Sequence, residues 1–99
     1  MKRTLLALLL TGISAPAAFA GPIDGACMRA GRANDPALCK CIQRAADLTL
    51  TRADQRRAAG FFKDPHKAQE VRQSDRASDA AFWRRYRNFG DTAEAYCAQ

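Results

Sequence analysis

The chain has 99 residues, 47% of them hydrophobic and 26% charged, and its formal net charge at neutral pH is +6. This length supports one domain and excludes a multidomain protein. A modest positive charge favours solubility and weak attraction to anionic partners, but it identifies no partner.

The first twenty residues have the layout of a secretory signal peptide. A basic start (Lys2, Arg3) precedes an apolar run over residues 5–13, and the A-x-A pattern at 18–20 is typical of a cleavage site. We expect cleavage after this pattern, which leaves a single domain over residues 21–99, in the periplasm or outside the cell. An uncleaved membrane anchor is the alternative, but the uninterrupted apolar core is about half the ~20 residues that a span needs. No later stretch is apolar enough to cross a bilayer, and the exported part keeps fourteen basic and ten acidic residues, a net charge of +4.

The body of the chain shows helix signals and no strand alternation. A short helical turn is expected over residues 23–29. A polar cap and a proline at the first helical position predict a helix from Pro36 to about Leu48. The side of this helix that is expected to pack comprises Leu38, Cys41, Ile42, Ala45 and Leu48.

Two further helices are predicted from their caps. The pattern from Thr51 to Asp54 resembles a capping box and starts a helix to about Lys63. Within this helix the adjacent rings of Phe61 and Phe62 cannot both face the same way. Asp64-Pro65 repeats the cap and proline signal and opens a helix to about residue 73, and residues 74–78 are polar enough for a turn or a new helix start.

The terminal stretch "FWRRYRNFG" (82–90) alternates rings with arginines, as an amphipathic helix does before folding sorts its side chains by face. At 100° per residue, one stripe holds Phe82, Tyr86, Phe89, Ala93 and Tyr96. The opposite side holds Arg84, Arg87, Asn88 and Asp91. We expect the stripe to form the core, because a nucleic-acid platform would expose rings and cations together. Trp83 lies at the edge of the stripe, and Gly90 leaves a kinked helix and a break as alternatives.

The four cysteines, Cys27, Cys39, Cys41 and Cys97, all lie in the exported part. An even count in a small exported chain predicts two disulfides, which stabilise a domain with a thin core. Two residues of α-helix turn the direction by about 200°, so Cys39 and Cys41 should not bond to each other. Each is expected to bond either Cys27 or Cys97. Both assignments are open, and we take Cys27–Cys41 with Cys39–Cys97 as the expectation.

Two chemical roles compete with the structural role of the C-x-C pair. A redox pair needs an exposed thiolate of low pKa and a supporting fold that this chain lacks. A zinc site would favour two C-x₂₋₄-C pairs, whereas the chain has one C-x-C and two distant single cysteines. We therefore expect no metal, no cofactor and no catalytic residue.

The remaining polar residues predict a recognition surface instead of a catalytic site. The lone histidine has no partner for metal binding, and Glu70, Asp75 and Asp79 are expected to form solvated salt bridges. The stretch "HKAQEVRQSDR" (66–76) is polar nearly all round, so its helix should leave a broad charged face. The candidate partner surface comprises Arg56, Arg57, His66, Lys67, Glu70, Arg72 and Trp83.

The stretch "DQRRAAGFFKDPHKAQEVRQSD", followed by "FWRRYRNFGDTAEAYC", resembles a family of short exported bacterial proteins, some of which are labelled arginine transporter. The resemblance covers roughly residues 39–97 and implies a role as an accessory component of arginine transport. It implies no site residues. A soluble protein that captures arginine would need acidic groups for the guanidinium.

Together these patterns predict an all-α fold, a small disulfide-stapled bundle of three to four helices. The expected function is a non-catalytic binding or interaction role in the periplasm or outside the cell. The partner is expected to be a protein or a small anionic molecule and not nucleic acid. Accessory arginine transport is the alternative, and a thiol–disulfide redox protein is the third.

Overall fold

A computed structural model describes residues 21–31 and 35–97, and the predicted signal peptide lies outside this part of the chain. The described residues form five α-helices and contain no strand. They are α1 (Pro22–Ala30), α2 (Pro36–Thr49), α3 (Arg52–Lys63), α4 (Pro65–Arg72) and α5 (Ala77–Cys97). The all-α class is confirmed. Five helices stand where three or four were expected, because the predicted turn at 23–29 is a complete helix.

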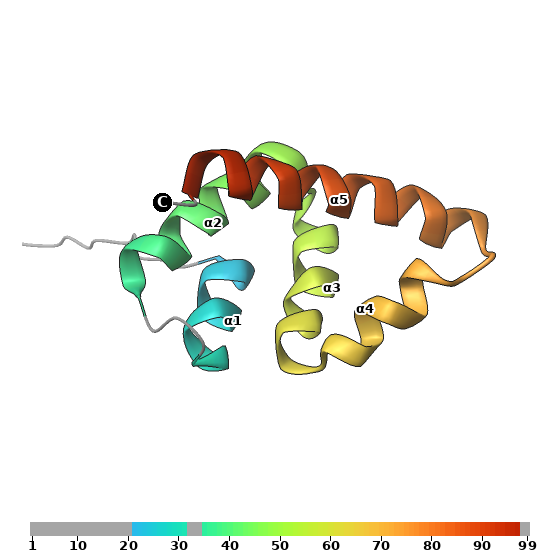
Figure 1. Ribbon diagram of the computed structural model, residues 1–99, viewed down its shortest axis with the longest axis horizontal. Coiled ribbons are helices and arrows are strands. Elements are labelled where there is room, and N and C mark those ends of the chain that lie inside the picture. The colour runs from blue at the N-terminus through green and yellow to red at the C-terminus, as the bar shows by residue number, and fades with distance from the viewer. Residues whose placement is uncertain (1–20, 32–34, 98–99) are drawn as a thin grey trace, which may run out of the picture.

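The five helices form an open arrangement around α5 (Figure 1). The long helix α5 packs against α2 near one end and against α4 near the other. Helix α1 packs against both α2 and α3, so α1 and α3 lie side by side beneath α5. Contacts between the α3 and α5 aromatic rings complete the core.

The predicted caps form at three helix starts. The side-chain oxygens of Asp35, Thr51 and Asp64 accept backbone N–H groups in the first turns of α2, α3 and α4, at 3.0, 3.1 and 3.2 Å. These bonds satisfy donors that the helix itself leaves unpaired. They explain why the start of each helix was predictable from local sequence.

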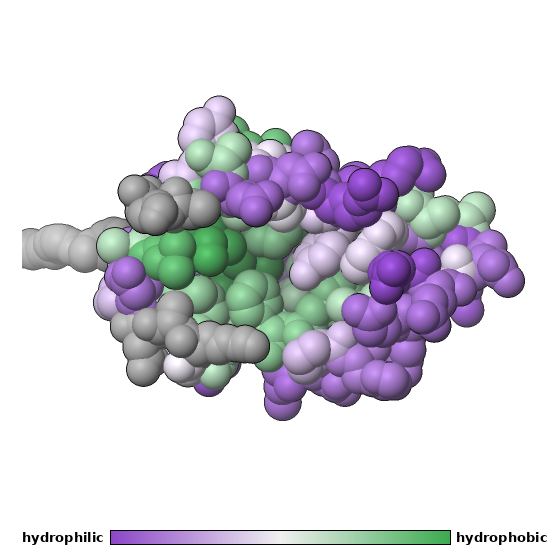
Figure 2. Space-filling model, in the orientation of Figure 1, coloured by the Kyte–Doolittle hydropathy of each residue, from purple (hydrophilic) through white to green (hydrophobic). Residues whose placement is uncertain are grey.

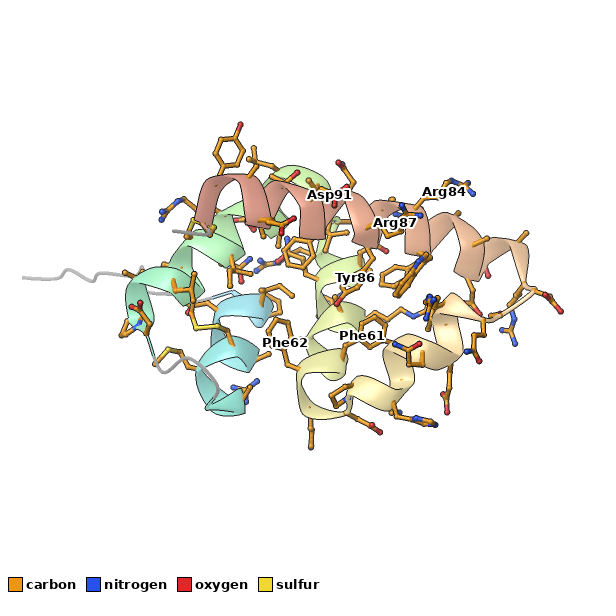
Figure 3. The ribbon with its side chains drawn as sticks, in the orientation of Figure 1. Phe61, Phe62, Arg84, Tyr86, Arg87 and Asp91 are labelled. Carbon is orange, nitrogen blue, oxygen red and sulfur yellow. A yellow bond between two sulfur atoms is a disulfide. The ribbon has the colours of Figure 1, made fainter. Side chains whose placement is uncertain are left out.

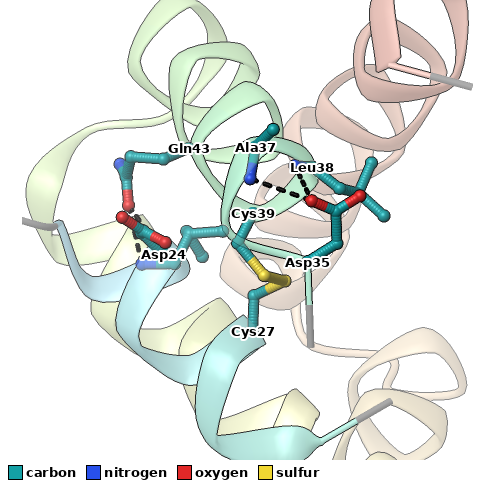
Figure 4. Close-up of a disulfide and its surroundings, with 8 residues drawn as sticks. Asp24, Cys27, Asp35, Ala37, Leu38, Cys39 and Gln43 are labelled. Carbon is teal, nitrogen blue, oxygen red and sulfur yellow. Dashed lines mark hydrogen bonds between the residues drawn. A yellow bond between two sulfur atoms is a disulfide. The ribbon is translucent and has the colours of Figure 1, made fainter. Parts of the chain in front are cut away.

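Helix α1 is capped from a distance, by Gln43 of α2. The Gln43 Oε1 accepts the backbone N–H groups of Ile23 and Asp24, both at 2.9 Å (Figure 4). Its Nε2 donates to Oε1 of the buried Gln55 in α3, at 2.7 Å. A Cβ added to Gly21 would overlap the end of the Gln43 side chain, so a larger residue there would have to displace this amide. One buried amide network therefore joins α1, α2 and α3.

Helix α5 sorts its residues by face as predicted over most of its length. Phe82 and Phe89 are buried, whereas Arg84, Arg87 and Asp91 are exposed on the outer side (Figure 3). The helix is continuous through Gly90, with neither a break nor a change of element there.

Two expected core residues are instead exposed, Tyr96 at 71% and Leu48 at 75%. At the end of α5 the inward face passes to Cys97, one turn beyond Ala93, so Tyr96 points to solvent. In α2 the buried face runs through Cys39, Gln43 and Ala46, and Leu48 lies about 200° from Ala46. Ala45 is buried as predicted, but the buried face also includes Gln43, which a hydrophobic pattern does not count.

Candidate functional site

Two disulfides fix the arrangement of the helices, and no cysteine is free. Cys27–Cys39 joins α1 to α2 with a Cα–Cα distance of 5.7 Å (Figure 4), and Cys41–Cys97 joins α2 to α5 with 5.8 Å. The prediction of two disulfides, with none inside the C-x-C pair, is confirmed. The expected pairing of Cys27 with Cys41 and Cys39 with Cys97 is wrong. The fully buried Cys39 faces α1, so Cys41, on the other side of α2, faces α5.

Two of the seven residues in the candidate partner surface hold the fold together. The Arg57 Nη2 lies 2.7 Å from Asp79 Oδ1, and the Arg57 guanidinium lies over the Phe82 ring, 4.5 Å from its centroid. The half-buried Trp83 packs on Tyr86 with their ring centroids 5.1 Å apart. These side chains are therefore already engaged with neighbouring helices or rings.

The other five residues of this surface are exposed, on α3 (Arg56) and on α4 (His66, Lys67, Glu70 and Arg72). His66 Nε2 and Glu70 Oε2 are 4.0 Å apart, and both side chains are largely in solvent. Such an exposed pair contributes little to stability. The role of these residues in binding a partner stays a prediction.

Two carboxylates each accept hydrogen bonds from an arginine of another helix. Asp54 of α3 accepts from Arg85 of α5 at both oxygens, from Nε at 2.7 Å and from Nη2 at 3.1 Å. Asp79 accepts from Arg57. Hydrogen bonds from these arginines lower the pKa of both carboxyl groups below the usual 3.8. The two pairs tie α3 to α5 and leave neither carboxylate free for an outside guanidinium.

The Asp54–Arg85 pair predicts a change in acid stability. Because the folded-state pKa of Asp54 is lowered, its contribution is complete above the unfolded-state pKa and is lost as the pH falls through the folded value. The unfolding free energy of the wild type should therefore fall as the pH drops below about 3.8, and more steeply than that of Asp54→Asn. Urea unfolding at several acidic pH values measures both slopes. Asp75→Asn, which removes an exposed carboxylate, is the control and should keep the wild-type slope; equal slopes for Asp54→Asn and the wild type would contradict the prediction.

The most distinctive feature of the surface is an apolar cavity of about 350 Å³. It opens where α1, α2 and α3 meet the middle of α5, and Figure 2 shows it as a hydrophobic hollow. Its lining comprises Cys27, Ala30, Leu38, Ile42, Phe61, Phe62, Pro65 and Tyr86. We call this space the apolar cavity.

Three aromatic rings, Phe61, Phe62 and Tyr86, line the apolar cavity from α3 and α5 (Figure 3). Phe61 is buried and packs edge-on against Tyr86, with ring centroids 5.2 Å apart, while Phe62 stays half-buried. Tyr86 is the only polar side chain among the described residues of the lining. Burial raises the pKa of Tyr86 above its usual value of 10.0, so its hydroxyl is neutral at physiological pH.

The sequence pattern predicted a core position for Tyr86, made no such prediction for Phe61 and Phe62, and indicated no cavity. One signal was available, since adjacent rings at 61 and 62 had to point in different directions. Only the first of them is buried in the core. The other lines a space that α1 and α2 leave open, and no local pattern encodes such a space.

Comparison with family models, with curated proteins and with solved structures finds no match for this chain. Among the helices of residues 21–31 and 35–97, none is long and apolar enough to cross a membrane. The function proposed below depends on the geometry of this chain alone.

Proposed function

We propose that this protein is a small exported, non-catalytic binding protein and that the apolar cavity is its binding site. The observation that carries the proposal is the cavity itself, about 350 Å³ with apolar walls and a single neutral hydroxyl. Ligand sites in proteins are typically concave, largely apolar and about 300–1,000 Å³ in volume. The two disulfides join α1 to α2 and α2 to α5, three of the helices whose residues line this space.

Export is part of the proposal. The N-terminal pattern is typical of a signal peptide, and stable disulfides are typical of proteins in an oxidising compartment. The two disulfides of this chain therefore support a periplasmic or extracellular location.

The cavity supports apolar binding better than capture of arginine, the alternative that the family resemblance implies. A bound guanidinium needs carboxylates at hydrogen-bond distance, and none is among the lining residues that the structure describes. Asp54 and Asp79 already bind the protein's own arginines.

A fluorescence titration tests the proposal, because the single tryptophan lies beside the site. Trp83 packs on Tyr86, which lines the cavity, so a bound molecule should change the Trp83 emission. The protein is expressed with its own leader, purified from the periplasm of a bacterial host and titrated with decanol. We expect a saturable change, and mass spectrometry of the same sample should show a chain that begins at Gly21.

A matched pair of variants locates the binding. Ala30 is exposed and lines the cavity, so Ala30→Phe should fill it and weaken decanol binding at least tenfold, the effect of about 1.4 kcal/mol. Ala95, near the C-terminal end of α5, is also exposed but is not among the lining residues of the cavity, and Ala95→Phe should bind as the wild type does. The absence of saturable binding, or wild-type binding by Ala30→Phe with an unchanged circular dichroism spectrum, would overturn the proposal.

A further inference from the structure

A second pocket lies directly beside the apolar cavity. Its volume is about 420 Å³, and it shares Ala30 and Phe62 with the cavity. The rest of its lining comprises Ala26, Arg29, Ala59, Gly60 and Lys63. A Cβ added to Gly60 would meet no atom within 4 Å, so this part of the lining is open space. We call it the cationic pocket.

Among the residues that the structure describes, two cations and no acidic residue line the cationic pocket. Arg29 lies in the last turn of α1 and Lys63 is the last residue of α3, and these helices lie side by side. The Arg29 guanidinium folds back along α1, since its Nη1 would lie 3.2 Å from a Cβ on Gly25. Neither Arg29 nor Lys63 takes part in the salt bridges found among the described residues.

We infer that the protein binds an anionic amphiphile, with the alkyl chain in the apolar cavity and the anionic head in the cationic pocket. This inference rests on the proposed function, and it adds the chemical class of the ligand. An apolar space favours a hydrocarbon chain because burying the chain removes its surface from water. Two cations, with no carboxylate among the described residues of the lining, favour a negative head. Phe62 and Ala30, which are common to both linings, place head and chain next to each other.

This ligand class excludes amphiphiles of the same shape whose head is cationic or neutral. A cationic amphiphile would bring its charge towards Arg29 and Lys63, and a neutral one would gain nothing from them. A free alkyl carboxylate and an anionic phospholipid in a bilayer both carry an anionic head on an alkyl chain. We assign the site to the free molecule, because a cavity of about 350 Å³ encloses one short chain.

Three chain-matched probes test the inference through the Trp83 signal: decanoate, decanol and decyltrimethylammonium. At low salt we expect decanoate to bind about fivefold more tightly than decanol, and decyltrimethylammonium to bind most weakly. Added salt should reduce the preference for decanoate, since the two cations are exposed to solvent. Vesicles of phosphatidylglycerol form a separate arm and should not displace bound decanoate.

The double variant Arg29→Ala/Lys63→Ala should lower the affinity for decanoate about fivefold and leave that for decanol unchanged. The variant Arg56→Ala/Lys67→Ala removes the same charge from exposed positions that line neither space, and it should keep the wild-type preference. Equal binding of decanoate and decanol by the wild type would overturn this inference but leave the proposed function intact. Binding of none of the probes would overturn both. Binding only to vesicles, or a preference that survives in Arg29→Ala/Lys63→Ala, would overturn the assignment of the head to these cations.

Discussion

Replacing Cys41 and Cys97 together by alanine is expected to lower the free energy of unfolding by about 4 kcal/mol. The two cysteines are 56 residues apart, so their bond closes a loop that contains all of α3 and α4 and nearly all of α5. Without the bond, the unfolded chain regains the entropy of that loop. A domain of this size has a total stability of roughly 4–12 kcal/mol, so the loss removes a third or more of it and the variant should unfold at a much lower urea concentration. Urea unfolding followed by far-ultraviolet circular dichroism measures the loss.

The other disulfide provides the comparison. Cys27 and Cys39 are 12 residues apart, and the same entropy model gives a loss of about 3 kcal/mol for Cys27→Ala/Cys39→Ala. That variant should also loosen the contact between α1 and α2 near the missing bond. The hydrogen bonds from the first turn of α1 to Gln43 would remain. A loss below about 2 kcal/mol for Cys41→Ala/Cys97→Ala would contradict the prediction, because the helices would then hold together without the crosslink.

Local signals in the sequence were enough to place the helices. Asp35, Thr51 and Asp64 each cap the helix that follows, and a cap depends only on residues within one turn. The sorting of α5 into a ring face and an arginine face also follows from spacing alone. These features were predictable because their causes lie within a few residues.

The disulfide pairing depends on causes that lie far apart in the chain. Which side of α2 faces α1 is fixed by Gln43, which reaches across to the first turn of α1 and to Gln55. A glutamine reads as a surface residue in a hydrophobic pattern. The pattern therefore gave no indication that the side of α2 that carries Cys39 faces α1. The same pattern placed Leu48 in the core.

The candidate site is harder still to predict, because it is a space and not a set of residues with a chemical signature. Leu38 and Ile42 read as ordinary core residues of α2, and the structure leaves both half-buried at the cavity. Arg29 and Lys63 are isolated basic residues in sequence. Only the side-by-side packing of α1 and α3 brings them to one pocket.

Replacing Phe82 by alanine is expected to lower the free energy of unfolding by about 3–5 kcal/mol. Phe82 is 1% exposed and is among the largest fully buried side chains of the described residues. Its ring packs edge-on against Phe61 at 6.0 Å, stacks on Tyr86 at 5.9 Å and lies under the Arg57 guanidinium. The truncation removes all of these contacts and leaves a void. Urea unfolding of the oxidised protein measures the loss.

Tyr96→Ala is the matched control, since Tyr96 belongs to the same predicted stripe of α5 but is 71% exposed. Its change in unfolding free energy should stay within about 0.5 kcal/mol. Equal losses for the two variants would mean that the sequence pattern describes the buried face better than the structure does. Phe82 also supports the Tyr86 ring that lines the apolar cavity, so Phe82→Ala should weaken decanol binding even under conditions where the variant stays folded. Tyr96→Ala should leave that binding unchanged, because the cavity is shaped by the buried rings of α5 and not by its exposed end.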